Sequence, residues 1–194
     1  MRVNRNSVRH GLGAIVAIVA LAVAAAAQTS QQPAAENVRI KNFGQMDERF
    51  YRGAQPKEKD YQDLAALGIK TVIDLQDSPK GYEKPAVEAL GMRYVNIPMS
   101  DKDYPDEAQI KAFLKLVDDP ATGKFFVHCA GGRHRTGVVG AVYRFNHYHW
   151  NFDQVYKEMK DYDFYTSWGH GDMKKYVEDY WRRIQADNVS TAGR

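Results

Sequence analysis

One stretch of the chain combines residue types that could perform nucleophilic chemistry on a phosphate. It reads His128-Cys129-Ala130-Gly131-Gly132-Arg133-His134-Arg135-Thr136-Gly137 and contains the only cysteine of the 194 residues. Apolar runs at 125–127 and 138–142 flank it, which predicts a strand, a tight loop and then a helix. Two glycines let the loop curl so that N–H groups converge, and the helix N-terminus adds its positive end. The stretch therefore predicts an anion site.

Cys129 stands where that field would hold its thiol as the thiolate, which is the nucleophilic form. Arg135 supplies a planar pair of donors that match two phosphate oxygens. A thiolate that faces a phosphate cradle predicts phosphoryl transfer through a cysteinyl-phosphate intermediate.

The spacing of these residues resembles the signature of the cysteine-dependent protein tyrosine phosphatases. Five residues separate Cys129 from Arg135, His128 precedes the cysteine and Thr136 follows the arginine. The run at 51–56 is similar to the opening segment of dual-specificity phosphatases. The resemblance covers about residues 50–160 and implies the compact dual-specificity fold, because the chain is too short for the larger tyrosine-specific domain.

Carried over residue by residue, the resemblance implies catalytic roles for Cys129, Arg135 and Thr136 and a structural role beside the site for His128. The implied substrate-binding residues are Ala130, Gly131, Gly132, Arg133, His134 and Arg135. The resemblance implies no cofactor and no metal.

The leaving group of such a reaction needs a proton, which a positioned carboxylic acid can give. Asp101, Asp103 and Asp106 lie in the loop at 98–106, before an expected helix. Asp106 is explained by the start of that helix, and Asp103 could act in the same way from just outside it. Asp101 matches the place of the acid in the phosphatase-and-tensin and regenerating-liver phosphatases, so it is the first candidate and Asp103 the alternative.

The scaffold around this loop contains a repeated pattern. The stretches 67–75 and 90–97 each place a glycine after a short helical pattern and before a β-branched run. With 125–127 as a third inner strand and a first strand near 50–52, this predicts an α/β domain with a mainly parallel sheet and helices on both faces. Further helices are expected at 106–117, with Pro105 in the first turn, and at 138–148, 152–159 and 172–184.

The first 27 residues have the pattern of a secretory signal peptide. Arg2, Arg5 and Arg9 precede an apolar run at 12–27 that ends in small residues. We expect cleavage after Ala27, a linker at 28–37, a phosphatase domain at 38–187 and a flexible tail at 188–194. The product would be periplasmic or secreted, whereas a retained segment 12–27 would anchor the chain in a membrane.

Charge balance narrows the range of partners. Without the three arginines of the first 27 residues, the 27 basic side chains fall to 24 and equal the 24 acidic ones. A balanced chain indicates no nucleic-acid partner, and a membrane only if the first segment is retained. We expect a phosphorylated protein or a small phosphoester as the substrate.

Two substrate classes and two other functions remain as alternatives. The stretch 133–137 is similar to the loop of fungal and plant atypical dual-specificity phosphatases that act on inositol pyrophosphates, and exported bacterial tyrosine phosphatases are similar too. Ala130 departs from the basic residue that lipid-directed members carry after the cysteine, which argues against phosphoinositides. A rhodanese-like sulfurtransferase would need neither Asp101 nor Thr136, and a non-catalytic phosphate binder would not need the thiol.

Overall fold

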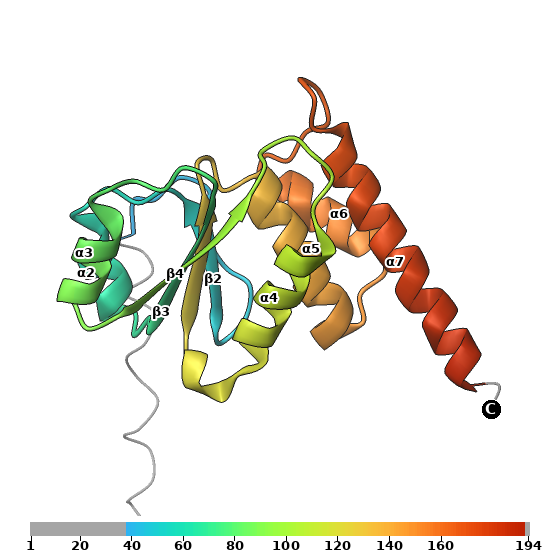
Figure 1. The fold of residues 1–194 in the computed structure, drawn as a ribbon, viewed down its shortest axis with the longest axis horizontal. Coiled ribbons are helices and arrows are strands. Elements are labelled where there is room, and N and C mark those ends of the chain that lie inside the picture. Colours follow the sequence, from blue (N-terminus) through green and yellow to red (C-terminus); the bar gives the residue numbers. More distant parts are fainter. Residues whose placement is uncertain (1–37, 193–194) are drawn as a thin grey trace, which may run out of the picture. The chain divides into compact units, whose positions relative to one another are not determined.

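Five strands form one mostly parallel sheet within residues 38–192, the part of the chain that the computed structural model describes (Figure 1). The strands are β1 (Gly44–Gln45), β2 (Phe50–Ala54), β3 (Thr71–Gln76), β4 (Arg93–Met99) and β5 (Phe125–Cys129). Their order is β1-β2-β5-β3-β4, and the short β1 alone runs antiparallel to its neighbour. The prediction of a mainly parallel sheet is confirmed.

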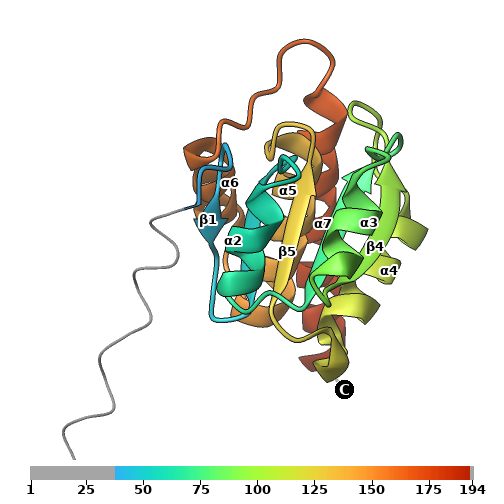
Figure 2. The same cartoon turned by 90° about the vertical axis from the view of Figure 1, so that its left-hand side faces the viewer.

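Helices cover both faces of the sheet. They are α2 (Asp60–Ala66), α3 (Glu83–Ala89), α4 (Glu107–Asp118), α5 (His134–Tyr148), α6 (Phe152–Asp161) and α7 (Gly171–Ala192), with a short 3₁₀ turn at Pro120–Thr122. Helices α2 and α3 lie on one face, in front of the strands in Figure 2, and α4 to α7 lie on the other. Each face has its own apolar core. Strands β3 and β5 lie between these layers and are buried along their whole length, as parallel strands covered on both sides must be.

The repeated helix-to-strand pattern is confirmed. Gly68 and Gly91 follow α2 and α3, have φ angles of 83° and 72°, and lead towards β3 and β4. A side chain would be strained at these angles, which explains why glycine ends both helices.

The start of α4 differs in detail from the prediction. Asp106 is the N-cap residue and accepts a hydrogen bond from the backbone N–H of Ala108 at 2.9 Å, while Gln109 completes a capping box. Pro105 therefore precedes the cap and does not lie in the first turn. The expected role of Asp106 at the helix start is confirmed, because its carboxylate satisfies an N–H that the helix leaves unpaired.

Helix α5 is buried along most of its length yet carries a charge. Arg144 forms an ion pair with Glu158 of α6 at 2.6 Å and donates a hydrogen bond to the carbonyl oxygen of Met46 at 2.9 Å. A buried cation is tolerated when its donors are satisfied in this way. The ion pair joins α6 to α5, the helix that follows the loop after Cys129.

Helix α7 is longer than predicted. It continues to Ala192, so residues 188–192 of the expected tail are helical, because no helix-breaking residue occurs before Gly193. The expected signal peptide at 1–27 and linker at 28–37 lie outside the described residues. Between residues 38 and 192, no helix has both the length and the apolar character that a membrane span requires.

Candidate active site

The Cys129 thiol lies at the edge of the sheet where the parallel strands end. Cys129 is the last residue of β5 and pairs with Ala54, the last residue of β2. The chain then turns through four residues into α5. Ligand sites in parallel sheets form at this carboxyl edge. The predicted order of strand, loop and helix is confirmed.

Gly132 allows the loop to lie against β2. Its φ angle is +65°, and a Cβ at this position would overlap the backbone of Gly53 and Ala54. Both conditions exclude any larger residue without a shift of the backbone. Gly131, by contrast, has room for a side chain.

Groups outside the loop hold its carbonyl oxygens. Arg52 donates to the carbonyl of Gly132 at 2.8 Å, and the Asn42 side chain donates to that of Gly131 at 2.8 Å. The backbone N–H of Gln55 donates to the carbonyl of Ala130 at 3.4 Å. With its carbonyls engaged in this way, the loop keeps N–H groups available for an anion.

Arg52 is the largest fully buried side chain in this region, at 1% exposure. Its guanidinium lies 3.9 Å from the centre of the Tyr162 ring, a cation–π contact that replaces part of its lost hydration. Burial lowers the pKa of Arg52 to about 10, so the group remains charged at neutral pH. Arg52 is therefore a buried structural residue that supports the loop.

The surroundings of Cys129 favour the thiolate. Burial acts to raise the pKa of the thiol, but the Thr136 hydroxyl and N–H, the Arg135 charge and the Arg133 N–H together lower it below the ordinary value. The buried Thr136 hydroxyl has no oxygen or nitrogen partner among the described residues, which leaves it available to the sulfur. A thiol stabilised by N–H donors at a helix start and by a neighbouring cation is suited to nucleophilic attack.

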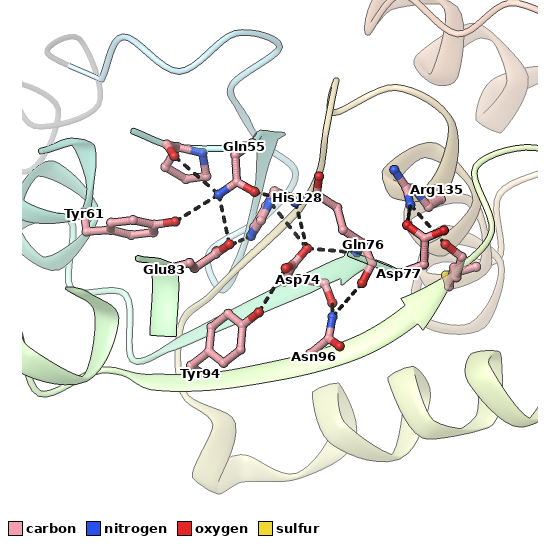
Figure 3. Close-up of polar contacts among 12 residues, drawn as sticks. Gln55, Tyr61, Asp74, Gln76, Asp77, Glu83, Tyr94, Asn96, His128 and Arg135 are labelled. Atoms are coloured by element: carbon pink, nitrogen blue, oxygen red, sulfur yellow. Dashed lines mark hydrogen bonds and ion pairs between the residues drawn. The ribbon is translucent and has the colours of Figure 1, made fainter. Parts of the chain in front are cut away.

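Arg135 is positioned by the ends of two other strands. Its guanidinium donates to the carbonyl of Met99, at the end of β4, at 3.0 Å. It also lies 3.5 Å from the carboxylate of Asp77, just after β3 (Figure 3). Both contacts are made by the Nη1 nitrogen and restrain the guanidinium, whose planar set of donors suits bidentate phosphate binding.

A cavity of about 180 Å³ opens above the thiol. Its walls are formed by Asp101, Cys129, Ala130, Gly131, Arg133, His134, Arg135, Tyr165 and His170. Of the predicted catalytic and substrate-binding residues other than the alternative acid, Gly132 and Thr136 do not line it, and Thr136 is fully buried. Asp101 lines the cavity, whereas the exposed Asp103 does not.

One wall of the cavity comes from the segment that precedes α7. His134 and His170 stack with ring centres 3.6 Å apart and planes 12° apart, and Tyr165 meets His134 edge-on at 4.4 Å. Burial and the neighbouring His170 lower the pKa of His134 to about 4, so the ring is neutral at neutral pH. The sequence analysis did not assign His170 or Tyr165 to the site, although both line the cavity. Their position within the aromatic stretch 162–171, which ends in two glycines around His170, was the only available signal.

His128 belongs to a buried polar network on the α2–α3 side of the sheet (Figure 3). Its Nε2 lies 2.6 Å from Glu83, and its Nδ1 lies 3.9 Å from Asp74. Burial opposes a charge on His128, but the hydrogen bond and charge of Glu83 raise its pKa above the ordinary value. Gln55 donates to Glu83 at 2.9 Å and so connects this network to the loop that its own N–H holds.

Among the described residues, Asp74, Glu83 and His128 are also close enough together to ligate a metal ion. However, the short bond between His128 and Glu83 already satisfies two of the three groups. A metal would have to displace that bonded proton, so we interpret the cluster as structural support for Cys129.

Comparisons with known proteins agree with this geometry. Residues 15–174 match the family described as "DSP-PTPase phosphatase fused to NAD+ Kinase". The dual specificity protein phosphatase TpbA of Pseudomonas aeruginosa is 28% identical over 153 residues, which cover 78% of this chain and 66% of TpbA.

Two solved structures share the fold. The core catalytic domain of the PP-IP phosphatase SIW14 from S. cerevisiae has a TM-score of 0.62 at 21% identity and covers 77% of this chain and 94% of its own. A cysteine-to-serine variant of P. aeruginosa TpbA in complex with phosphotyrosine has a TM-score of 0.62 at 23% identity. The match covers 81% of this chain and 94% of the TpbA chain. Because the family match spans most of the chain, the protein belongs to the DSP-PTPase phosphatase family and is a phosphatase.

Proposed function

We propose that the protein hydrolyses phosphate monoesters, with phosphotyrosine in proteins as the main substrate, and that Cys129 is the nucleophile. The thiolate attacks phosphorus, the ester P–O bond breaks, and Asp101 gives its proton to the departing oxygen. Water then attacks the cysteinyl-phosphate, Asp101 accepts its proton, and the S–P bond breaks to release phosphate and the thiolate. Loop N–H groups and Arg135 hold the phosphoryl oxygens in both steps.

The observation that carries this proposal is the position of Cys129. Its thiol, with a lowered pKa, lies in the wall of a cavity that also contains Arg135 and the carboxylic acid Asp101. Nucleophile, cation and acid are the three groups that the reaction needs. A sulfurtransferase or a non-catalytic phosphate binder would not require the acid.

Phosphotyrosine is favoured because Tyr165 offers an aromatic face on the cavity wall for a phenyl ring. The relative TpbA is named a dual specificity phosphatase, and its variant was solved with phosphotyrosine. The second candidate is an inositol pyrophosphate, which is supported by Arg133 as a second cation on the wall and by the likeness to the PP-IP phosphatase SIW14. The ligand bound by an inactive Cys129→Ser variant distinguishes the two.

The acid can be identified with substrates that differ in their leaving groups. Asp101→Asn should slow hydrolysis of phenyl phosphate on the order of 100-fold, because phenoxide needs a proton to depart. Hydrolysis of p-nitrophenyl phosphate should fall less, because nitrophenolate is already a stable anion. The basic limb of the pH–rate profile should flatten in the same variant.

Asp103→Asn is the matched control for that experiment. Asp103 is exposed and outside the cavity, so both rates should stay within about twofold of the wild type. A leaving-group effect in Asp103→Asn and none in Asp101→Asn would reverse the assignment. If neither variant shows the effect, the proton comes from another group.

We also propose that the protein is exported, on the basis of the basic start and the apolar run at 12–27. Amino-terminal sequencing of the native protein should give Gln28 as the first residue, in a fraction outside the cytoplasm. An intact Met1 in the membrane fraction would instead show that the segment is a retained anchor.

A further inference from the structure

The backbone of Asp101 is held by a side chain far away in the sequence. The Nδ1 atom of His170 lies 2.8 Å from the carbonyl oxygen of Asp101, a contact across 69 residues. Asp101 itself lies in an exposed bend after β4. The other hydrogen bonds within this bend are local, from the N–H groups of Lys102 and Asp103 to the Ser100 hydroxyl. Among the described residues, the bond to His170 is the only hydrogen bond that joins Asp101 to a distant part of the chain.

His170 is itself firmly placed. It is 7% exposed and precedes α7, whose first turns are buried through Met173, Tyr176 and Val177. Its ring stacks on His134, the first residue of α5, which is adjacent to Arg135. His170 therefore connects the Asp101 bend with the helix that follows the Cys129 loop.

The hydrogen-bond partners define where the protons lie. His134 Nε2 is 3.1 Å from the carbonyl oxygen of Tyr165, and His170 Nδ1 faces the carbonyl of Asp101. Because a carbonyl can only accept, each of these nitrogens must carry a hydrogen. His170 thus binds the main chain of Asp101 and leaves the carboxyl group free to exchange a proton.

We propose that His170 is a positioning residue that holds Asp101 at the cavity above Cys129. This inference rests on the proposed role of Asp101 as the acid. The bond fixes the Asp101 main chain. The stack on His134 sets the position of His170, and so of Asp101, relative to the Cys129 loop. Without that bond, the acid would sample positions in the exposed bend from which it cannot reach the leaving group.

Two substitutions separate the hydrogen bond from the ring stack. His170→Phe keeps an aromatic ring against His134 but removes the donor, whereas His170→Asn keeps a donor near the Nδ1 position. His170→Phe should lower kcat for phenyl phosphate about tenfold, with a smaller loss for p-nitrophenyl phosphate. His170→Asn should retain more of the phenyl phosphate rate than His170→Phe.

A double variant tests whether His170 acts through Asp101. In an Asp101→Asn background, His170→Phe should change the rate by less than about twofold, because the acid is already absent. Inhibition by inorganic phosphate should be unchanged in the single variant, which would show an intact Cys129 loop. If His170→Phe does not fold, His170→Gln, with its donor near the Nε2 position, replaces it and should be slower than His170→Asn.

Trp168→Ala is the control from the same segment. Trp168 is 85% exposed and does not line the cavity, so both substrates should keep their wild-type rates. An equal loss on both substrates, or a full further loss in the Asp101→Asn background, would overturn the role of His170. If Asp101→Asn alone shows no leaving-group effect, it is the proposed acid that fails.

Discussion

Cys129→Ser is expected to abolish turnover while leaving the binding of phosphate esters intact. A serine hydroxyl at this position would not ionise near neutral pH, so the rate should fall by a factor on the order of 10⁵ or more. The groups proposed to bind the phosphate are the loop N–H donors and Arg135, and the substitution removes none of them. Cys129 is 3% exposed and a serine fits the same space, so the fold should persist.

The variant can be measured in two ways. Turnover of p-nitrophenyl phosphate reports the chemical step, and calorimetry reports the affinity for a phosphotyrosine peptide and for an inositol pyrophosphate. We expect the peptide to bind more tightly, and the reverse order would favour the inositol substrate. Appreciable turnover by Cys129→Ser would contradict the covalent mechanism.

The lowered pKa of Cys129 gives this prediction a pH dependence. Because the pKa lies below the ordinary value, the thiolate persists to lower pH than that of a free cysteine. Alkylation of the wild-type protein by iodoacetamide should therefore have its midpoint below that of a free thiol. Since Cys129 is the only cysteine, the reaction reports this thiol alone.

Arg135→Lys is expected to reduce kcat/KM by about 100-fold or more. Lysine keeps the positive charge but offers a single ammonium group in place of two parallel donors, so bidentate contact with the phosphoryl oxygens is lost. The lost transition-state stabilisation should be about 3 kcal/mol or more. The contact with the Met99 carbonyl, which holds the guanidinium at 3.0 Å, would also change.

Two controls isolate this geometric effect. The retained charge should keep the pKa of Cys129 low, so the pH dependence of alkylation should change little. Arg133→Lys alters a neighbouring arginine that lies 27% exposed near Asp163, and it should cost less than Arg135→Lys. If Arg135→Lys costs no more activity than Arg133→Lys, Arg135 acts mainly through its charge. If alkylation of Arg135→Lys shifts to that of a free thiol, the activity is lost through the thiolate and not through bidentate phosphate contact.

The amino-acid sequence by itself determined the local units of this protein. An apolar run, a glycine-containing turn and a second apolar run define β5, the Cys129 loop and α5, because each signal is read within a few neighbouring residues. The glycines at 68 and 91 marked two helix-to-strand units in the same way. Since parallel strands end at one edge, the strand before the loop at 98–106 also places that loop near Cys129.

Only the tertiary structure decided which distant groups support the site. Arg52 bonds the Gly132 carbonyl across 80 residues, Glu83 bonds His128 across 45, and His170 bonds Asp101 across 69. Such contacts have no periodicity, because they depend on how the helices and loops pack over the strand edge. A single arginine, glutamate or histidine in the sequence is equally compatible with an exposed position. The strand order and the packing of α7 therefore determined the wall of the cavity, whereas the loop sequence determined its chemistry.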